Sequence, residues 1–373
     1  AWRALAAAGA LLGRPLALQQ VTVDNYAVAE CDNYMGKYVK VGALGKFAHS
    51  REVTPVDTDP ASAPKHGQDV IRMNRDTLYS MVVFDLEAAP ATLGFPEVGG
   101  RFVSMGFISE GHDVFPSMYT PGTYKLTKDD CGCAAPCRTT SQDGVTCTAF
   151  GMRYGFVILR TLADADNATD VADAHKAQDA WTVEQAAAGA WQVPDWSHDD
   201  LVAVRKNLLA LKATSTEPVH FGFMSGPEAV DHLYGLLNIA AGWGGMRRED
   251  QSYTFWAPIS IGSYTLTVPK VPVDGNGFWS ITVYNKEGYM FADPSNYNSA
   301  AQGAGGLNPD GTTTVYFGGC GEPARQKPSK AHCLPIQEGW NIVVRFFRPG
   351  KAILDGSFHF PSPTPDGPAY LTV

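Results

Sequence analysis

Two arginines could take part in chemistry, because each lies among apolar residues in a segment with strand-like alternation. Arg160 is in the segment 154–162, and Arg345 is in the segment 340–347. A guanidinium on an apolar strand face needs a partner, because burying an unpaired charge is costly. The carboxylates that could form a structural ion pair with them are Asp76, Asp85 and Asp113. The functional alternative is that one arginine binds the carboxylate or phosphate of a ligand.

The segment 277–285 has two unlike faces, because side chains alternate along a strand. One face is predicted to be core and carries Trp279, Ile281 and Val283. The opposite face mixes aromatic and hydroxyl side chains, namely Phe278, Ser280, Thr282 and Tyr284. The segment 76–86 has the same layout, with a tyrosine on its second face. If these second faces line a cleft between domains, the candidate ligand-binding residues are Asp76, Tyr79, Arg160, Tyr284 and Arg345.

Motifs that would name a reaction do not occur in the sequence. There is no G-x-S-x-G elbow, phosphate-binding loop, dinucleotide fingerprint, H-E-x-x-H pair or EF-hand loop. We therefore predict no cofactor and no metal site, and the catalytic residues stay unknown. Glu228 and His232 are four residues apart on a predicted helix, so they could form an acid–base pair or lie on a solvated helix edge.

The seven cysteines point to an oxidising compartment. Six of them fall in two Gly-rich segments, and we predict that they form disulfides: Cys131, Cys133, Cys137, Cys147, Cys320 and Cys333. A zinc knuckle is the alternative for the first four, but no histidine or regular C-x-x-C pair accompanies them. Cys31, on a predicted helix, is left as a buried thiol or an intermolecular link. Asn167 begins a glycosylation sequon, which would make an exported chain a glycoprotein.

Composition limits the class of partner. The net charge of −9 argues against nucleic acid, which needs a basic face. No apolar run is long enough to span a bilayer. Residues 1–23 are either a remnant of an export signal or an Ala-rich extension of the mature chain. Together with the cysteines, these features predict a secreted protein or one in another extracytoplasmic compartment.

The order of the predicted elements indicates an α+β, β-rich fold with two β-sandwich-like domains and a helical segment between them. A chain of 373 residues is long enough for two cores. We expect a helix from Val23 to Gly42 capped by Asp24, and helices over 168–188 and after Ser197 and Pro227. The last predicted strand is Gly356–Phe360. The predicted domains are 24–163 with a cysteine-rich insert at 129–148, the helical segment 164–247, and 248–373.

Several blocks of sequence carry a family resemblance. Residues 74–80 (NRDTLYS) and 84–86 (FDL) resemble the signature of the domain of unknown function 1254. Similar to the partner domain of unknown function 1214 are 241–245 (AGWGG), 277–285 (GFWSITVYN), 308–311 (NPDG), 317–320 (FGGC), 333–335 (CLP), 339–341 (GWN) and 348–356 (RPGKAILDG). The resemblance implies an exported, largely β-structured, two-domain protein. It implies no catalytic residues, because no activity of the family is generally established.

Two hypotheses about function follow. The first is that the protein binds or acts on a small organic molecule, anionic or sugar-like, in a cleft between the domains. The second is that it is a structural or interaction component of a cell surface or an extracellular assembly, as a homo-oligomer or with another partner. The second rests on the missing motifs, the cysteine insert and Cys31.

Overall fold

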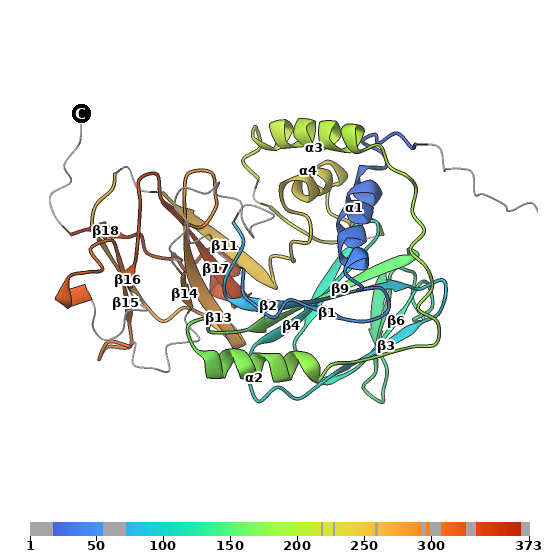
Figure 1. Ribbon diagram of the computed structural model, residues 1–373, viewed down its shortest axis with the longest axis horizontal. Coiled ribbons are helices and arrows are strands. Elements are labelled where there is room, and N and C mark those ends of the chain that lie inside the picture. The colour runs from blue at the N-terminus through green and yellow to red at the C-terminus, as the bar shows by residue number, and fades with distance from the viewer. Residues whose placement is uncertain are drawn as a thin grey trace, which may run out of the picture.

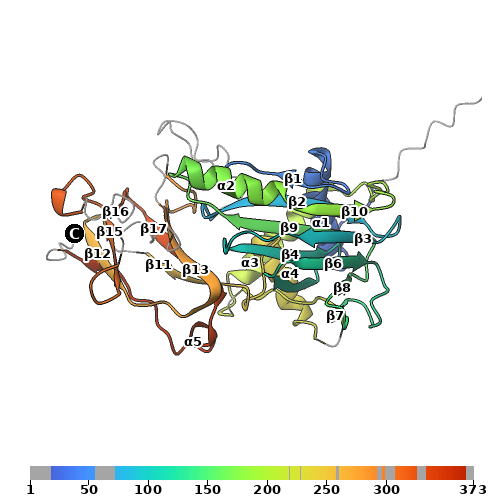
Figure 2. The same cartoon turned by 90° about the horizontal axis from the view of Figure 1, so that it is seen from below.

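The computed structural model describes residues 18–54, 72–217, 219–226, 228–257, 260–291, 296–298, 307–325 and 333–366. Figure 1 shows two β units side by side. Helices α1 (Tyr26–Lys40), α3 (His198–Lys212) and α4 (His232–Gly242) lie over one face of the N-terminal unit, and α2 (Ala168–Asp179) lies on the opposite side. Figure 2 shows the two units from below, with strands β11 (Gln251–Trp256) and β13 (Val273–Tyr284) of the C-terminal unit next to the N-terminal sheets. The predicted α+β, β-rich class with two sandwich-like units is confirmed.

The N-terminal unit is a sandwich of two five-stranded sheets. Sheet 1 has the order β1-β2-β9-β4-β5, with β1 at Ala48–His49, β2 at Thr77–Asp85, β9 at Tyr154–Leu162, β4 at Val103–Ser109 and β5 at Val114–Met118. Sheet 2 has the order β10-β3-β6-β8-β7, with β10 at Thr182–Gln185, β3 at Ala91–Phe95, β6 at Gly122–Thr127, β8 at Thr146–Ala149 and β7 at Cys137–Thr140. Phe84 and Phe107 of sheet 1 meet Leu126 of sheet 2 in one core, as expected where two apolar sheet faces pack together.

The C-terminal unit repeats this arrangement with four-stranded sheets. Sheet 3 has the order β11-β17-β13-β14, with β11 at Gln251–Trp256, β17 at Asn341–Pro349, β13 at Val273–Tyr284 and β14 at Asn296–Asn298. Sheet 4 has the order β16-β15-β12-β18, with β16 at Cys333–Leu334, β15 at Thr313–Phe317, β12 at Tyr264–Val268 and β18 at Thr364–Pro365. Trp279, Ile281 and Val283 lie in the core between the sheets, so the predicted core face of β13 is confirmed.

The helices are α1 (Tyr26–Lys40), α2 (Ala168–Asp179), α3 (His198–Lys212), α4 (His232–Gly242) and the short α5 (Lys351–Leu354), with a 3-10 turn at Pro323–Arg325. Helix α1 places Cys31 and Met35 on sheet 1, and its other side packs against α3 and α4. Ser197 caps α3 as predicted, because its hydroxyl accepts a hydrogen bond from the Asp200 amide at 3.3 Å. The N-terminal cap of α1 is Asn25 and not Asp24.

Two predicted elements are wrong. The helix expected over 168–188 ends at Asp179, and Thr182–Gln185 pairs with β3 as an antiparallel edge strand. Trp181 is buried in the sandwich core, and its burial places the following residues beside β3 of sheet 2. The segment 164–247 is therefore not purely helical. Gly356–Phe360 has no strand partner, since the chain leaves α5 there as an irregular segment.

The predicted cysteine pairing is confirmed in both segments. The disulfides are Cys131–Cys147, Cys133–Cys137 and Cys320–Cys333. Cys31 is a buried free thiol, and the indole of Trp243 donates to its sulfur at 3.2 Å. Three disulfides are consistent with an oxidising, extracytoplasmic location. No helix in the described part of the chain is long and apolar enough to cross a membrane.

The two β units meet at a seam where sheet 3 faces the end of sheet 1. Phe278 and Phe347 stack with their ring centroids 4.2 Å apart, and Phe102 packs edge-on against Phe278 at 5.1 Å. Asp250 also bridges the units, because its carboxylate accepts hydrogen bonds from the Ser117 amide and the Tyr119 hydroxyl. The second face of β13 therefore meets another layer, and the predicted second-face residues lie at this seam.

Candidate functional site

Each of the two arginines lies on a central strand and has the same kinds of neighbours. Arg345 of β17 pairs with Tyr253 of β11 and with Ser280 of β13. Arg160 of β9 pairs with Tyr79 of β2 and with Ser104 of β4. Cross-strand partners lie on the same face of a sheet. Each guanidinium therefore lies on the same face of its sheet as a tyrosine and a serine of the two neighbouring strands.

The Arg345 guanidinium is bound on several sides by the protein. It donates to the Thr282 hydroxyl at 3.0 Å, to the Tyr284 hydroxyl at 2.7 Å and to the Arg72 carbonyl at 2.5 Å. Burial opposes its charge. Nevertheless the pKa of Arg345 is raised, because Tyr284, Asp76 and Tyr253 favour the charged form.

The neighbours of Arg345 are also tied to the N-terminal unit. The Tyr284 hydroxyl donates to the Met73 carbonyl at 2.6 Å, and burial raises its pKa. Ser280 donates to the Asp76 carboxylate at 2.7 Å. Tyr284 and Asp76 are both fully buried. These bonds fix sheet 3 against the segment that leads into β2.

Arg160 is also buried, with only 6% of its surface exposed, but it has fewer partners. Its Nη2 donates to the Gly244 carbonyl at 3.3 Å, and its guanidinium lies 5.7 Å from the centroid of the Tyr79 ring. The Tyr79 hydroxyl accepts from the Asn74 amide at 2.7 Å. Nη1 of Arg160 is buried and has no hydrogen-bond partner among the described residues. An unmet buried donor of this kind is rare in native proteins.

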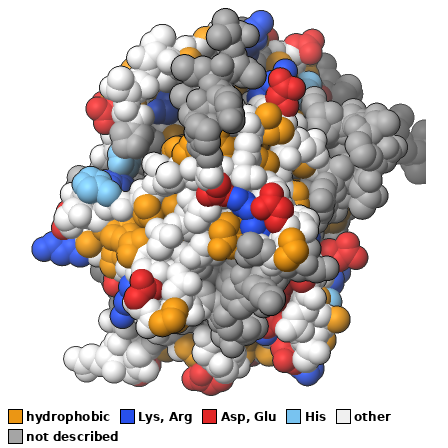
Figure 3. All heavy atoms as spheres, turned by 90° about the vertical axis from the view of Figure 1, so that its left-hand side faces the viewer, with side chains coloured by type: hydrophobic (Ala, Val, Ile, Leu, Met, Phe, Trp, Pro, Cys, Tyr) orange, Lys and Arg blue, Asp and Glu red, His pale blue; other side chains and the backbone are white. Residues whose placement is uncertain are grey.

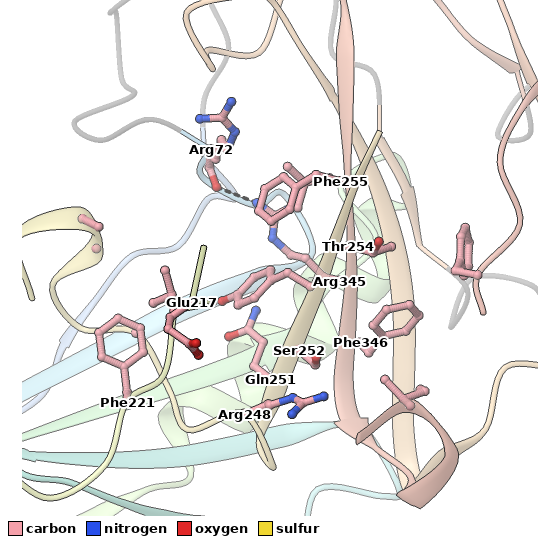
Figure 4. A pocket seen from close by; sticks show the side chains of 18 of the residues that line it. Arg72, Glu217, Phe221, Arg248, Gln251, Ser252, Thr254, Phe255, Arg345 and Phe346 are labelled. Atoms are coloured by element: carbon pink, nitrogen blue, oxygen red, sulfur yellow. Dashed lines mark hydrogen bonds between the residues drawn. The ribbon is translucent and has the colours of Figure 1, made fainter. Parts of the chain in front are cut away.

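A cavity of about 790 Å³ opens between sheet 3 and the segment that contains α4. In Figure 4, Phe221, Glu217 and Phe255 lie on one side of strand β11, and Thr254 and Phe346 lie on the other. The cavity lies on both faces of the edge strand β11, because the successive residues 251–255 point alternately to opposite faces and all five line it. Its lining residues are Arg72, Lys212, Glu217, Val219, Phe221, Ala241, Gly242, Gly245, Arg248, Gln251, Ser252, Tyr253, Thr254, Phe255, Val343, Arg345, Phe346, Ile353, Phe358, His359 and Phe360.

Apolar surface inside this cavity is left uncovered. Phe255 is 62% exposed, Tyr253 is 42% exposed and Val219 is 44% exposed, although all three line the cavity wall. Gly245 permits the close approach of Phe221, because a Cβ at that position would collide with the phenylalanine ring. The glycine-dense end of α4 thus shapes the wall.

The five predicted ligand-binding residues converge on the seam, but only Arg345 lines the cavity. Arg160 and Tyr79 do not line the cavity, although the charge of each group acts on the pKa of the Tyr253 hydroxyl. Tyr284 and Asp76 lie behind Arg345. Sequence reasoning missed Tyr253, although the alternation of Tyr253 and Phe255 with the polar Ser252 and Thr254 is a readable two-faced pattern.

Two of the proposed carboxylate partners have other roles. Asp85 forms a two-point ion pair with Arg153, at 2.8 Å and 3.1 Å. Asp113 accepts from the Met224 amide at 2.8 Å and from Ser225. Neither carboxylate is the partner of Arg160 or Arg345. Chain spacing alone could not show this, because Met224 and Ser225 come from the distant segment before α4.

The cysteine-bearing face of α1 holds a second buried polar cluster. Asp32 and Glu110 lie close together, and burial raises the pKa of each carboxyl. The Trp196 indole donates to Asp32 at 2.7 Å. His112 is fully buried, and desolvation lowers its pKa to about 3, so the ring is neutral. Within the described ranges, no group of three or more His, Cys, Asp or Glu side chains is placed to hold a metal ion.

Comparisons with known proteins place the chain by family and fold. Residues 46–185 match the family described as "Protein of unknown function (DUF1254)", and residues 259–351 match "Protein of unknown function (DUF1214)". No functionally curated protein matches the chain. The crystal structure of the VPA0106 protein from Vibrio parahaemolyticus is similar, with a TM-score of 0.67 and 14% identity over 92% of this chain and 97% of that one. A putative uncharacterised protein from Burkholderia cenocepacia has a TM-score of 0.43 at 11% identity, over 88% of this chain and 85% of that one.

Proposed function

We propose a function from the cavity, because the chain belongs to the proteins that pair a DUF1254 domain with a DUF1214 domain and neither family description names a function. The protein binds a small organic molecule between sheet 3 and the segment around α4. The observation that carries this proposal is the cavity of about 790 Å³ with uncovered aromatic walls and a few buried polar groups. Ligand sites typically have volumes of about 300–1,000 Å³ and this kind of lining.

The lining favours a ligand with a planar or apolar body. Phe221 and Phe255 provide opposing aromatic surfaces, and rings of this kind stack on aromatic or sugar-like groups. At the rim, Lys212, Glu217 and Arg248 carry charges of both signs. The ligand body is therefore recognised mainly by aromatic contact, and its polar groups by the arginine and tyrosine side chains.

We also propose that binding takes place outside the cytoplasm, on a secreted glycoprotein. Asn167 is exposed at the start of α2, where its side-chain oxygen caps the helix at 3.1 Å from the Thr169 amide. The side-chain nitrogen that would carry a glycan is not used by that cap. Figure 3 shows the end of the molecule formed by the C-terminal unit, where acidic and basic side chains are interspersed with hydrophobic ones. Among the described residues of that face, charges of one sign do not gather into a large patch that would suit a polyanionic partner.

A neutral fluorescent probe tests the proposal. We expect N-phenyl-1-naphthylamine to bind saturably with one site per chain, and Phe255→Ala and Phe221→Ala each to weaken binding about tenfold, since each removes an aromatic wall. Leu209→Ala is the matched control, because Leu209 is 41% exposed on α3 and does not line the cavity. Binding that is absent, or that the two wall variants leave unchanged, would contradict the proposed site.

A further inference from the structure

Two hydrogen-bond donors, one in the cavity wall and one close to it, are left unused by the described part of the chain. Nη1 of Arg160 has no partner in the described part of the chain, although the side chain is more than nine-tenths buried. The Tyr253 hydroxyl makes no hydrogen bond with any described residue, and its ring lines the cavity. Buried donors are nearly always paired in native proteins. Nη1 of Arg160 is such a buried donor, and the hydroxyl of Tyr253, whose side chain is 42% exposed in the cavity wall, is a second free donor. Together they point to an acceptor that comes from outside the chain.

Arg160 and Tyr253 belong to the same end of the cavity. Arg160 bonds the carbonyl of Gly244, and the next residue, Gly245, lines the cavity. Arg345 is the cross-strand neighbour of Tyr253, and the charges of Arg345 and Arg160 both favour ionisation of the Tyr253 hydroxyl. Desolvation is nevertheless the largest influence and raises the pKa of Tyr253. The phenol is therefore protonated at neutral pH and can donate.

The charges at this end are unbalanced. Arg345 has the buried Asp76 close by, which offsets its charge. Arg160 forms no ion pair with any described carboxylate. A buried cation without a counter-charge is costly, and an anionic ligand would relieve that cost. Sugars, which are neutral, would not.

We propose that the inner end of the cavity is a subsite for the carboxylate of an organic acid, held by Arg160 and Tyr253. This inference rests on the proposed function. One oxygen of the carboxylate accepts from Nη1 of Arg160 and the other from the Tyr253 hydroxyl, since two donors match two oxygens. Nη1 is covered, and the carboxylate reaches it when the Tyr253 side chain, which no described residue holds by a hydrogen bond, turns toward the cavity. The apolar body of the acid then packs between Phe221 and Phe255.

A matched pair of probes tests the subsite. Titration calorimetry at pH 7 compares 2-naphthoate with the neutral 2-naphthamide, which has the same ring and nearly the same shape. We expect the native chain to bind 2-naphthoate at least tenfold more tightly. Arg160→Met should abolish that preference and leave the affinity for 2-naphthamide unchanged, and Tyr253→Phe should reduce the preference about threefold to tenfold. Arg51→Gln, a surface arginine paired with Asp179, is the charge-matched control and should keep the preference.

The outcomes separate this inference from the proposed function. Equal affinities for the two probes in the native chain would overturn the carboxylate subsite, while the cavity would remain a binding site. If neither probe binds, the proposed function itself fails. If Arg160→Met weakens both probes equally, Arg160 only supports the wall, which also overturns the subsite. Tyr253→Phe keeps the ring and the fold, so it gives an answer even if Arg160→Met folds poorly.

Discussion

Arg345 and Arg160 are at matching positions in two sheets, each between a tyrosine and a serine on neighbouring strands. Arg345 is surrounded by acceptors that the protein supplies, including the Thr282 hydroxyl and the Arg72 carbonyl. Arg160 has one carbonyl partner and an unmet donor. The same residue in the same local setting can therefore be a structural element in one sheet and an available group in the other. What differs is the polar groups that the adjoining segments bring to it.

The largest effect should come from removing the bound arginine. Arg345→Met leaves the buried Asp76 carboxylate without its nearby cation and three acceptors without their donor. We expect a loss of about 3–5 kcal/mol in the free energy of unfolding. Differential scanning calorimetry should show the melting temperature falling by roughly 6–15 °C. Arg348→Met is the control on the same strand. Arg348 makes one exposed hydrogen bond to Asn276 and lies over the Tyr119 ring at 4.6 Å, so its loss should change stability by about 1 kcal/mol at most. A small loss for Arg345→Met would remove the distinction between the two arginines.

The comparison extends to carboxylates, where Asp32 lies beside Glu110 and not beside a cation. Burial raises the pKa of Asp32 to about 7, whereas an unfolded Asp titrates near about 3.9. At a pH between these two pKa values, Asp32 is protonated in the folded state and ionised in the unfolded state. The contribution of this carboxyl to the free energy of unfolding is therefore largest at acidic pH and falls as the pH rises toward 7. Asp32→Asn should remove this fall and raise the free energy of unfolding at pH 8 by on the order of 2 kcal/mol. Urea denaturation between pH 5 and pH 8 measures it.

Asp85 should respond to pH in the opposite sense. Its ion pair with Arg153 lowers the pKa of Asp85, so the stability that it provides is present at neutral pH and is lost on acidification below about pH 4. Asp85→Asn, the control for Asp32→Asn, should therefore destabilise the protein at pH 8. If both substitutions change the free energy of unfolding in the same direction at pH 8, the neighbouring group does not determine whether a buried carboxylate stabilises or destabilises the fold.

A smaller effect should follow when Arg345 loses a single acceptor. Thr282→Val keeps the shape of the side chain but removes the hydroxyl that accepts from the guanidinium at 3.0 Å. We expect a loss of about 1 kcal/mol in the free energy of unfolding, because the other acceptors remain. Thr267→Val on β12 is the control, since that side chain is exposed. A loss equal to that of Arg345→Met would mean that Thr282, and not the shared set of acceptors, holds the guanidinium.

The sequence alone predicted both strands that carry the arginines and the core face of β13, because alternation along a strand is a local property. The six paired cysteines were predictable for the same reason, since they cluster within two short segments. The cavity was not predictable. Its walls come from Phe221, Gly245 and Tyr253, which meet only when the segment around α4 packs beside sheet 3. Which arginine is satisfied also depends on distant carbonyls, such as those of Arg72 and Gly244, and backbone carbonyls have no sequence signature.

The smallest effect on stability should come from Arg160, and this prediction separates the two arginines most clearly. Arg160→Met removes a buried charge that no described carboxylate neutralises, together with a single hydrogen bond to Gly244. The lost bond and the relieved desolvation nearly cancel, so we expect a change of less than about 1 kcal/mol, of either sign. Calorimetry without ligand measures it beside Arg345→Met. A loss above about 3 kcal/mol would show that Arg160 stabilises the fold as much as Arg345 does. Its unpaired Nη1 would then give no support to a ligand subsite beside the cavity.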